Sequence, residues 1–221
     1  MKTADYSGAG GWSGENLSPD SAEVIAKQAK TGLWVFMAVI SSLFFLFLIA
    51  FMLRSQFGDW EQLSSPWKPL ADPWRLYVNT LLLACGSLCL QWSKVMAHRD
   101  ERKRMIEGLL LAGIFTGGFI LGQLWVWQQL VSLGYYVNSN PANSFFYLLT
   151  GLHGLHLLGG MVAWAKTIRR TWRSRVSKDI VLSIELCAMY WHYLLALWLV
   201  LLVLLTSSPQ SYAAFARLCG F

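Results

Sequence analysis

The run from Phe145 to Trp164 sets the strongest limit on the fold, because it holds no charged residue over a length that crosses a bilayer. His153 and His156 lie within it, and a spacing of three residues puts both imidazoles on one face of a helix. A charged group at the centre of a membrane helix costs about 2.5–3.5 kcal/mol on insertion scales. We therefore predict a transmembrane helix whose histidines face protein.

Long apolar runs recur along the whole chain, so the sequence predicts an all-α, polytopic membrane helix bundle. Hydrophobic residues make up 55% of the chain and charged residues 14%, whereas a soluble domain carries roughly 25% charged residues. We predict a membrane domain over 33–207, between a polar cytoplasmic tail over 1–32 and a short outer tail over 208–221. Its five transmembrane helices are predicted at about 33–53, 76–97, 105–130, 145–166 and 180–206.

The positions of the basic residues predict the orientation of these helices. The net charge of +6 does not indicate a nucleic-acid partner, since the basic residues lie mainly in short loops between apolar runs. With the N-terminus in the cytoplasm and the C-terminus outside, few of the 18 Lys and Arg residues fall on the outer side, namely Arg54, Lys68, Arg75 and Arg217. This distribution follows the positive-inside rule, and five membrane crossings are consistent with it.

The last predicted helix also carries ionisable groups, because Glu185 and His192 lie seven residues apart and share one face. Counted from the cytoplasmic ends, His156 and His192 both lie roughly 16 Å deep, near the middle of the membrane. We predict a buried polar layer of His153, His156, Glu185 and His192. Three interpretations stay open: polar contacts that fix helix packing, a haem held by two histidines, and a carboxylate–histidine site for a metal or a proton relay.

Other catalytic sites are not predicted. A di-iron bundle requires about four Glu and two His, whereas Glu107 and Glu185 are the only carboxylates in the predicted helices. No Ser/His/Asp set, Gly-rich phosphate loop or HExxH motif is visible. The four cysteines have neither disulfide nor zinc spacing. The residues alone therefore predict a five-helix membrane bundle with a buried polar layer that is not catalytic by itself, and beyond the open interpretations of that layer we assign no residue to a metal.

Two blocks of residues in the last two apolar runs form motifs of fixed spacing. The pattern T-G-x-H-G-x-H is matched by Thr150, Gly151, His153, Gly154 and His156. The pattern E-x-x-A-x-Y-W-H-F…W-L is matched by Glu185, Ala188, Tyr190, Trp191, His192, Trp198 and Leu199, with Tyr193 in place of Phe. Weaker signals along the chain are Lys30, Gly32, Phe36, Asn79, Thr80 and Gln123.

In order and spacing, these blocks resemble subunit III of the haem-copper oxidases, the family of cytochrome c and quinol oxidases. The resemblance covers about residues 30–207, and the chain is similar to the five-helix form, which lacks the first two of seven helices. Ile40, Val126 and Leu195 stand where many members carry carboxylates. The resemblance therefore transfers no role of those carboxylates in proton handling to this chain.

The resemblance implies a non-redox accessory subunit in a bacterial-type inner membrane. Its partners would be the catalytic subunit I, which holds the haems and copper, subunit II and membrane lipids. It would support assembly, lipid binding, proton uptake and active-site stability in aerobic respiration. Lys30 is a candidate contact for an anionic lipid head group. Two alternatives stay open: an accessory protein of a nitric oxide reductase, and a small membrane cytochrome b with His156 and His192 as haem ligands.

Overall fold

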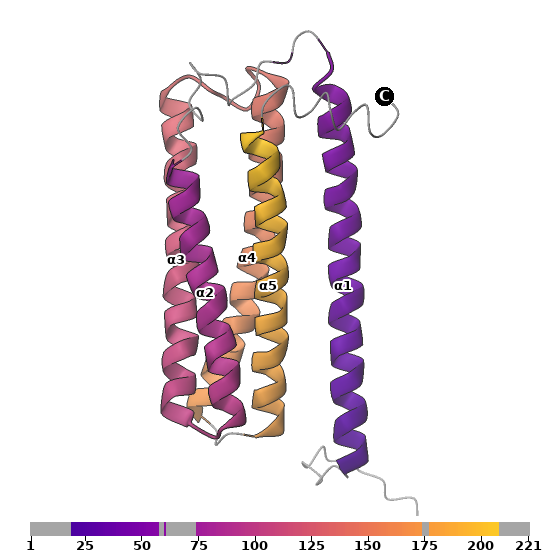
Figure 1. Cartoon of the computed structure of the whole chain (residues 1–221), viewed down its shortest axis with the longest axis vertical. Helices are drawn as coiled ribbons and strands as arrows, with labels where there is room; N and C mark the ends of the chain where they lie inside the picture. The colour runs from indigo at the N-terminus through magenta and orange to yellow at the C-terminus, as the bar shows by residue number, and fades with distance from the viewer. Residues whose placement is uncertain (1–18, 58–59, 61–73, 174–176, 208–221) are drawn as a thin grey trace, which may run out of the picture.

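The computed structural model describes residues 19–57, 60, 74–173 and 177–207, and the chain forms α-helices over nearly all of them. The helices are α1 (Pro19–Arg54), α2 (Trp74–His98), α3 (Arg102–Ser132), α4 (Pro141–Arg173) and α5 (Lys178–Thr206) (Figure 1). Each is long and apolar enough to cross a membrane. The prediction of an all-α, polytopic helix bundle is thereby confirmed.

The helices extend beyond the apolar runs from which they were predicted. α1 begins at Pro19, so the polar segment before the first apolar run is helical and continuous with it. α4 continues through a basic stretch to Arg173. Backbone hydrogen bonds continue past the hydrocarbon core, because a helix needs apolar side chains only where lipid surrounds it. The predicted outer tail and residues 1–18 lie outside the described residues.

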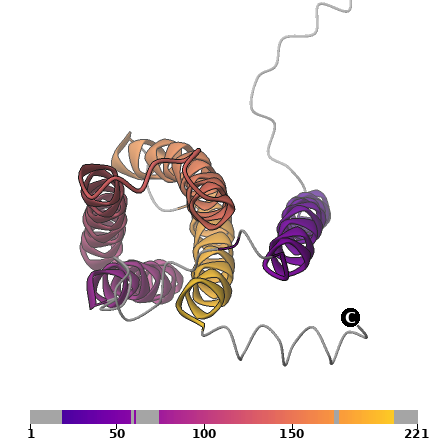
Figure 2. The ribbon, with the colours of Figure 1, turned by 90° about the horizontal axis from the view of Figure 1, so that it is seen from above.

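Four of the helices, α2 to α5, form a bundle, and α1 lies beside it (Figure 2). Within the described residues, α1 packs against α4 and α5 and against no other helix. Near its C-terminal end, the Phe51 ring packs edge-on against Phe145 of α4 at a centroid distance of 5.7 Å. Midway, the Tyr193 hydroxyl of α5 donates to the Met37 carbonyl at 3.1 Å. Much of the remaining surface of α1 is exposed and apolar.

Close approach of α2 and α3 depends on glycine at one position in particular. A Cβ at Gly108 would lie 2.9 Å from Ser93 Cβ and 3.1 Å from the Cys89 carbonyl oxygen, both on α2. These are backbone or backbone-proximal atoms that cannot rotate away. By contrast, a Cβ at Gly117 of the same helix would meet no atom within 4 Å. Gly108 therefore sets the distance between α2 and α3.

Three tryptophan side chains link the bundle helices through threonine hydroxyls. The Trp191 indole nitrogen of α5 donates to Thr116 Oγ1 of α3 at 2.9 Å. Two further bonds of this kind are Trp198 to Thr80 at 2.9 Å and Trp127 to Thr150 at 3.2 Å. In a membrane, such bonds satisfy the indole N–H where no water is present. The bonds of Trp191 and Trp198 fix α5 against α3 and α2 and so position the polar groups that α5 carries.

Candidate functional site

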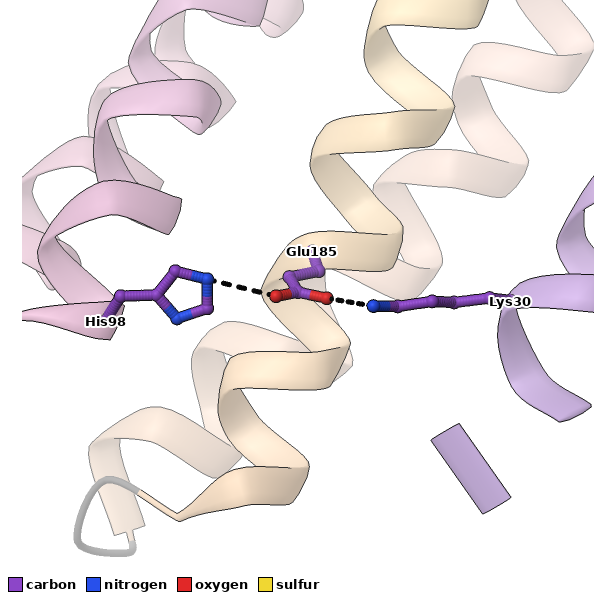
Figure 3. Close-up of polar contacts among 3 residues, drawn as sticks. All are labelled: Lys30, His98 and Glu185. Carbon is purple, nitrogen blue, oxygen red and sulfur yellow. Dashed lines mark ion pairs between the residues drawn. The ribbon is translucent and has the colours of Figure 1, made fainter. Parts of the chain in front are cut away.

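A chain of ion pairs joins three helices at the end of the molecule where α5 begins (Figure 3). Glu185 of α5 is its centre, with Oε2 2.7 Å from Lys30 Nζ of α1 and Oε1 3.0 Å from His98 Nε2 of α2. The Glu185 side chain is 17% exposed, against 43% for Lys30 and 50% for His98. The carboxylate is thus sheltered between helices while both partners reach solvent.

The positions of these three residues within their helices explain the arrangement. His98 is the last residue of α2, and Glu185 lies two turns into α5, which is N-capped by Ser177 through a bond from the Ile180 N–H. Lys30 lies on the part of α1 that precedes its apolar run. A carboxylate at this depth is close enough to the membrane surface for long basic side chains to reach it.

The other residues of the predicted polar layer lie in separate environments. His192 is exposed on α5, and its Nδ1 is hydrogen-bonded to the Ser87 hydroxyl of α2. His156 Nδ1 is 2.8 Å from the Leu152 carbonyl of its own helix, and its ring lies 5.8 Å from that of Phe44. The structure therefore does not bring the histidines and Glu185 into one cluster.

His153 is the most buried of these groups, with none of its surface exposed. Its ring lies 5.2 Å from Trp198 and 6.0 Å from Phe119, measured between centroids. Neither ring nitrogen has a hydrogen-bond partner among the described residues. A neutral imidazole packed against aromatic rings contributes contact area, so His153 fills space at the centre of the bundle.

A crevice of about 760 Å³ opens between α1, α4 and α5. Apolar side chains such as Phe36, Leu155 and Val162 line most of it, and Lys166 and Arg170 of α4 line one end. His156 also reaches this crevice. A mostly apolar space with two basic side chains in its lining is chemically suited to an anionic lipid.

The described residues offer little for a metal ion. No group of three or more His, Cys, Asp and Glu side chains in this part of the chain is arranged to hold one.

The two histidines considered as haem ligands, His156 and His192, lie apart. The Tyr190 hydroxyl of α5 donates a hydrogen bond to the backbone carbonyl of His156 at 3.2 Å. Tyr190 and His192 are two residues apart and so project from opposite sides of α5. The two histidines considered as haem ligands therefore do not face each other.

The sequence model of the family described as cytochrome c oxidase subunit III matches residues 13–207. This range includes all five helices in full. The chain belongs to this family. Subunit III is a non-catalytic subunit of the haem-copper oxidases. Membership of this family, together with five helices able to cross a membrane, implies an integral membrane component of such a complex.

Relatives with curated names agree with the family match. The chain is 30% identical over 160 residues to a probable cytochrome c oxidase subunit 3 of Mycobacterium tuberculosis, which covers 71% of this chain and 75% of the relative. It is 28% identical over 180 residues to cytochrome c oxidase subunit 3 of Thermostichus vulcanus, covering 79% of this chain and 84% of the relative.

The subunit III motif residues lie at contacts between helices. Asn79 of α2 donates to Gln123 Oε1 of α3 at 3.4 Å. Gly151 of α4 lies against the Trp127 indole, since a Cβ there would be 3.4 Å from it, whereas a Cβ at Gly154 would meet nothing within 4 Å. The motif tryptophans and Thr150 supply the interhelical bonds described above. Most of these residues thus have packing contacts within the chain.

Two of the positions that depart from the subunit III pattern lie in the core. Ile40 is 3% exposed and Val126 is 5% exposed. Both belong to the apolar core cluster, where burying a carboxylate is costly. The apolar side chains there agree with the local packing of this chain.

Several contact residues were missed by sequence reasoning. His98 looked like part of a charged turn, and Ser87 and Thr116 belong to no motif, whereas Thr80 was one of the weaker signals. Each becomes a partner only because a neighbouring helix brings a polar side chain to it. No local pattern in the sequence could have identified His98, Ser87 or Thr116 as contact residues.

Proposed function

We propose that this chain is the non-redox accessory subunit III of a haem-copper terminal oxidase in a bacterial inner membrane. In this role it supports the assembly of catalytic subunit I, beside subunit II, and the stability of its active site. The family match across residues 13–207 carries the proposal. The oxidase named in the bacterial relatives is a cytochrome c oxidase, which supports the same role here.

Lipid binding is the part of this role that the crevice between α1, α4 and α5 supports. Its apolar walls match an acyl chain, and Lys166 and Arg170 offer charge to a phosphate. Lys30 remains a candidate for a head group, since its side chain is 43% exposed although it pairs with Glu185. A lipid bound there would also fill the space between α1 and the bundle.

Support of proton uptake is the part that the ion-pair chain favours. A carboxylate and an imidazole, those of Glu185 and His98, line a depression of about 520 Å³ together with Asp100 and Lys30, at the end where α5 begins. With the predicted orientation, this depression faces the cytoplasm. Groups of this kind on an accessory subunit raise the local supply of protons to a neighbouring uptake site.

The geometry does not favour the alternative of a bis-histidine cytochrome b. His156 of α4 contacts the side of α5 opposite to His192, and each histidine is hydrogen-bonded within the chain. No observation on the described residues favours an accessory role in a nitric oxide reductase over the oxidase role. The terminal oxidase is therefore the function that we propose.

Purification of the tagged chain from its native membrane in mild detergent tests this function. Reduced-minus-oxidised visible spectra are recorded for the intact sample and after its dissociation. We expect haem and copper to co-purify and to stay with a larger partner on dissociation. Haem that follows the chain itself, or no haem in either sample, would contradict the proposal.

A further inference from the structure

One face of α5 lies open between α1 and α2. We call it the α5 face, and it consists of Met189, His192, Ala196, Leu199 and Val203, whose alternating spacing of three and four places them along one line. Leu199 is 44% and Val203 62% exposed, and His192 and Ala196 are exposed too. Figures 1 and 2 show α5 between α2 and α1.

Contacts on either side of the α5 face confirm its position. His192 is hydrogen-bonded to Ser87 of α2, on one side. The next residue, Tyr193, donates its hydroxyl to Met37 of α1, on the other side. The α5 face is therefore the surface that remains when both neighbouring helices have made their contacts.

His192 is an unusual residue for a lipid-facing surface. It lies at the midpoint of α5 (Lys178–Thr206), and so at the depth where hydrocarbon surrounds a helix. Ser87 occupies its Nδ1, whereas Nε2 has no hydrogen-bond partner in the described part of the chain. Ionisable side chains at this depth almost always face protein or a water-filled cavity. An exposed imidazole here indicates a surface that another molecule covers.

Lipid does not supply a hydrogen-bond partner for His192 Nε2, because acyl chains carry no hydrogen-bonding group. A transmembrane helix does, if it carries a hydroxyl, amide or carboxyl side chain at the same depth. The small side chain of Ala196, one turn from His192, allows such a helix to approach closely. The other exposed members of the α5 face are apolar and suit packing in a membrane.

We infer that a transmembrane helix of the catalytic subunit packs on the α5 face and hydrogen-bonds His192 Nε2 through a polar side chain. The identity of the partner rests on the proposed function, whereas the location and the chemistry of the contact rest on the structure. The surface is continuous with the Lys30–Glu185–His98 ion pairs, since Glu185 lies two turns from His192 along α5.

Site-directed photocross-linking in the intact complex tests this inference. The photoreactive residue p-benzoylphenylalanine replaces Ala196 in one variant and Leu121 in the control. Leu121 is 69% exposed on α3, outside the α5 face. Tagged chains are irradiated in native membranes, purified and analysed by mass spectrometry. We expect a cross-link to the catalytic subunit from position 196 and none from position 121.

The other outcomes separate this inference from the proposed function. If the catalytic subunit co-purifies but position 196 gives no cross-link to it, the inference is wrong and the proposed function stands. The same holds if position 121 gives that cross-link alone, or if position 196 cross-links only to a second copy of this chain. If no oxidase subunit co-purifies with the unaltered chain, the proposed function itself fails.

A pair of substitutions at His192 tests the hydrogen bond. His192→Phe keeps a ring but removes both nitrogens, and we expect about three- to tenfold less catalytic subunit to be recovered with the tagged chain. His192→Gln, which keeps a side-chain donor and acceptor, should restore part of the loss. Equal recovery from the Phe variant and the unaltered chain would show that no such bond forms. Folding is checked by the recovery of the variant chain itself.

Discussion

Replacing Glu185 by Gln tests whether the ion pairs hold α1 against the bundle. The substitution keeps the shape of the side chain and removes its charge. Lys30 Nζ at 2.7 Å then loses its partner on α5, and His98 Nε2 at 3.0 Å loses its charged acceptor. Because α1 packs only against α4 and α5 within the described residues, this pair is a large part of its attachment at that end.

The exposure of the partners sets the expected size of the effect. Fully exposed pairs contribute about 0.2–1 kcal/mol, and hydrogen bonds to charged groups about 1.5–3 kcal/mol when sheltered. Glu185 is 17% and Lys30 43% exposed, so the pair lies between these limits. We expect Glu185→Gln to cost about 1–2 kcal/mol, which raises the population of detached α1 about 5- to 30-fold.

Thiol labelling measures this population. A Cys introduced in place of Met37, which is 3% exposed where α1 meets α5, reacts with a maleimide only when α1 opens. Mass spectrometry of the peptide around position 37 gives the rate without interference from the native cysteines. Lys30→Gln should increase the rate nearly as much as Glu185→Gln. His98→Gln should increase it less, because His98 bonds α2 rather than α1 to Glu185.

Glu23→Gln is the matched control. Glu23 pairs with Lys27 within α1 at 2.9 Å, and the two side chains are 67% and 75% exposed. Loss of this pair should change the labelling rate by about twofold or less. The reasoning is refuted if Glu185→Gln leaves the rate within that range, or if Glu23→Gln accelerates labelling as strongly.

Further substitutions test packing, lipid binding and the indole bonds. Gly108→Ala should cost about 1–3 kcal/mol in SDS-induced unfolding, because its Cβ meets the α2 backbone. Gly117→Ala should leave unfolding unchanged or shift it to higher SDS. Arg170→Gln should lower the amount of anionic phospholipid that mass spectrometry finds on the purified chain, whereas Arg169→Gln, outside the crevice lining, should not. Trp198→Phe should cost about 1–2 kcal/mol by the same unfolding assay, because it removes the indole N–H that donates to Thr80 of α2.

Family membership and helix count could be predicted from the sequence, for a local reason. Each apolar run reports its own membrane crossing, and motif residues such as Thr150 and Trp191 have fixed spacing within one helix. The charge distribution also predicted a cytoplasmic N-terminus, which stays a prediction. These features depend on residues that are neighbours along the chain.

The contacts of Glu185 could be predicted only in part. The face of the last helix that it occupies was predictable, but the sequence grouped it with three histidines rather than with basic residues. That the partners are Lys30 and His98 depends on α1 and α2 lying on either side of α5. Periodicity tells which face of a helix a residue occupies but not which helix that face meets.

The sequence by itself determined five membrane helices, because in lipid each segment must satisfy its own backbone hydrogen bonds and so forms independently. It also determined the subunit III family, because the motif residues are close together along the chain. Only the tertiary structure decided that α1 stands outside the bundle, that His153 is enclosed by aromatic rings, and that His192 is exposed. The reason is that helix association in a membrane has little hydrophobic drive. It depends on side-chain shape and on hydrogen bonds between residues far apart in the chain.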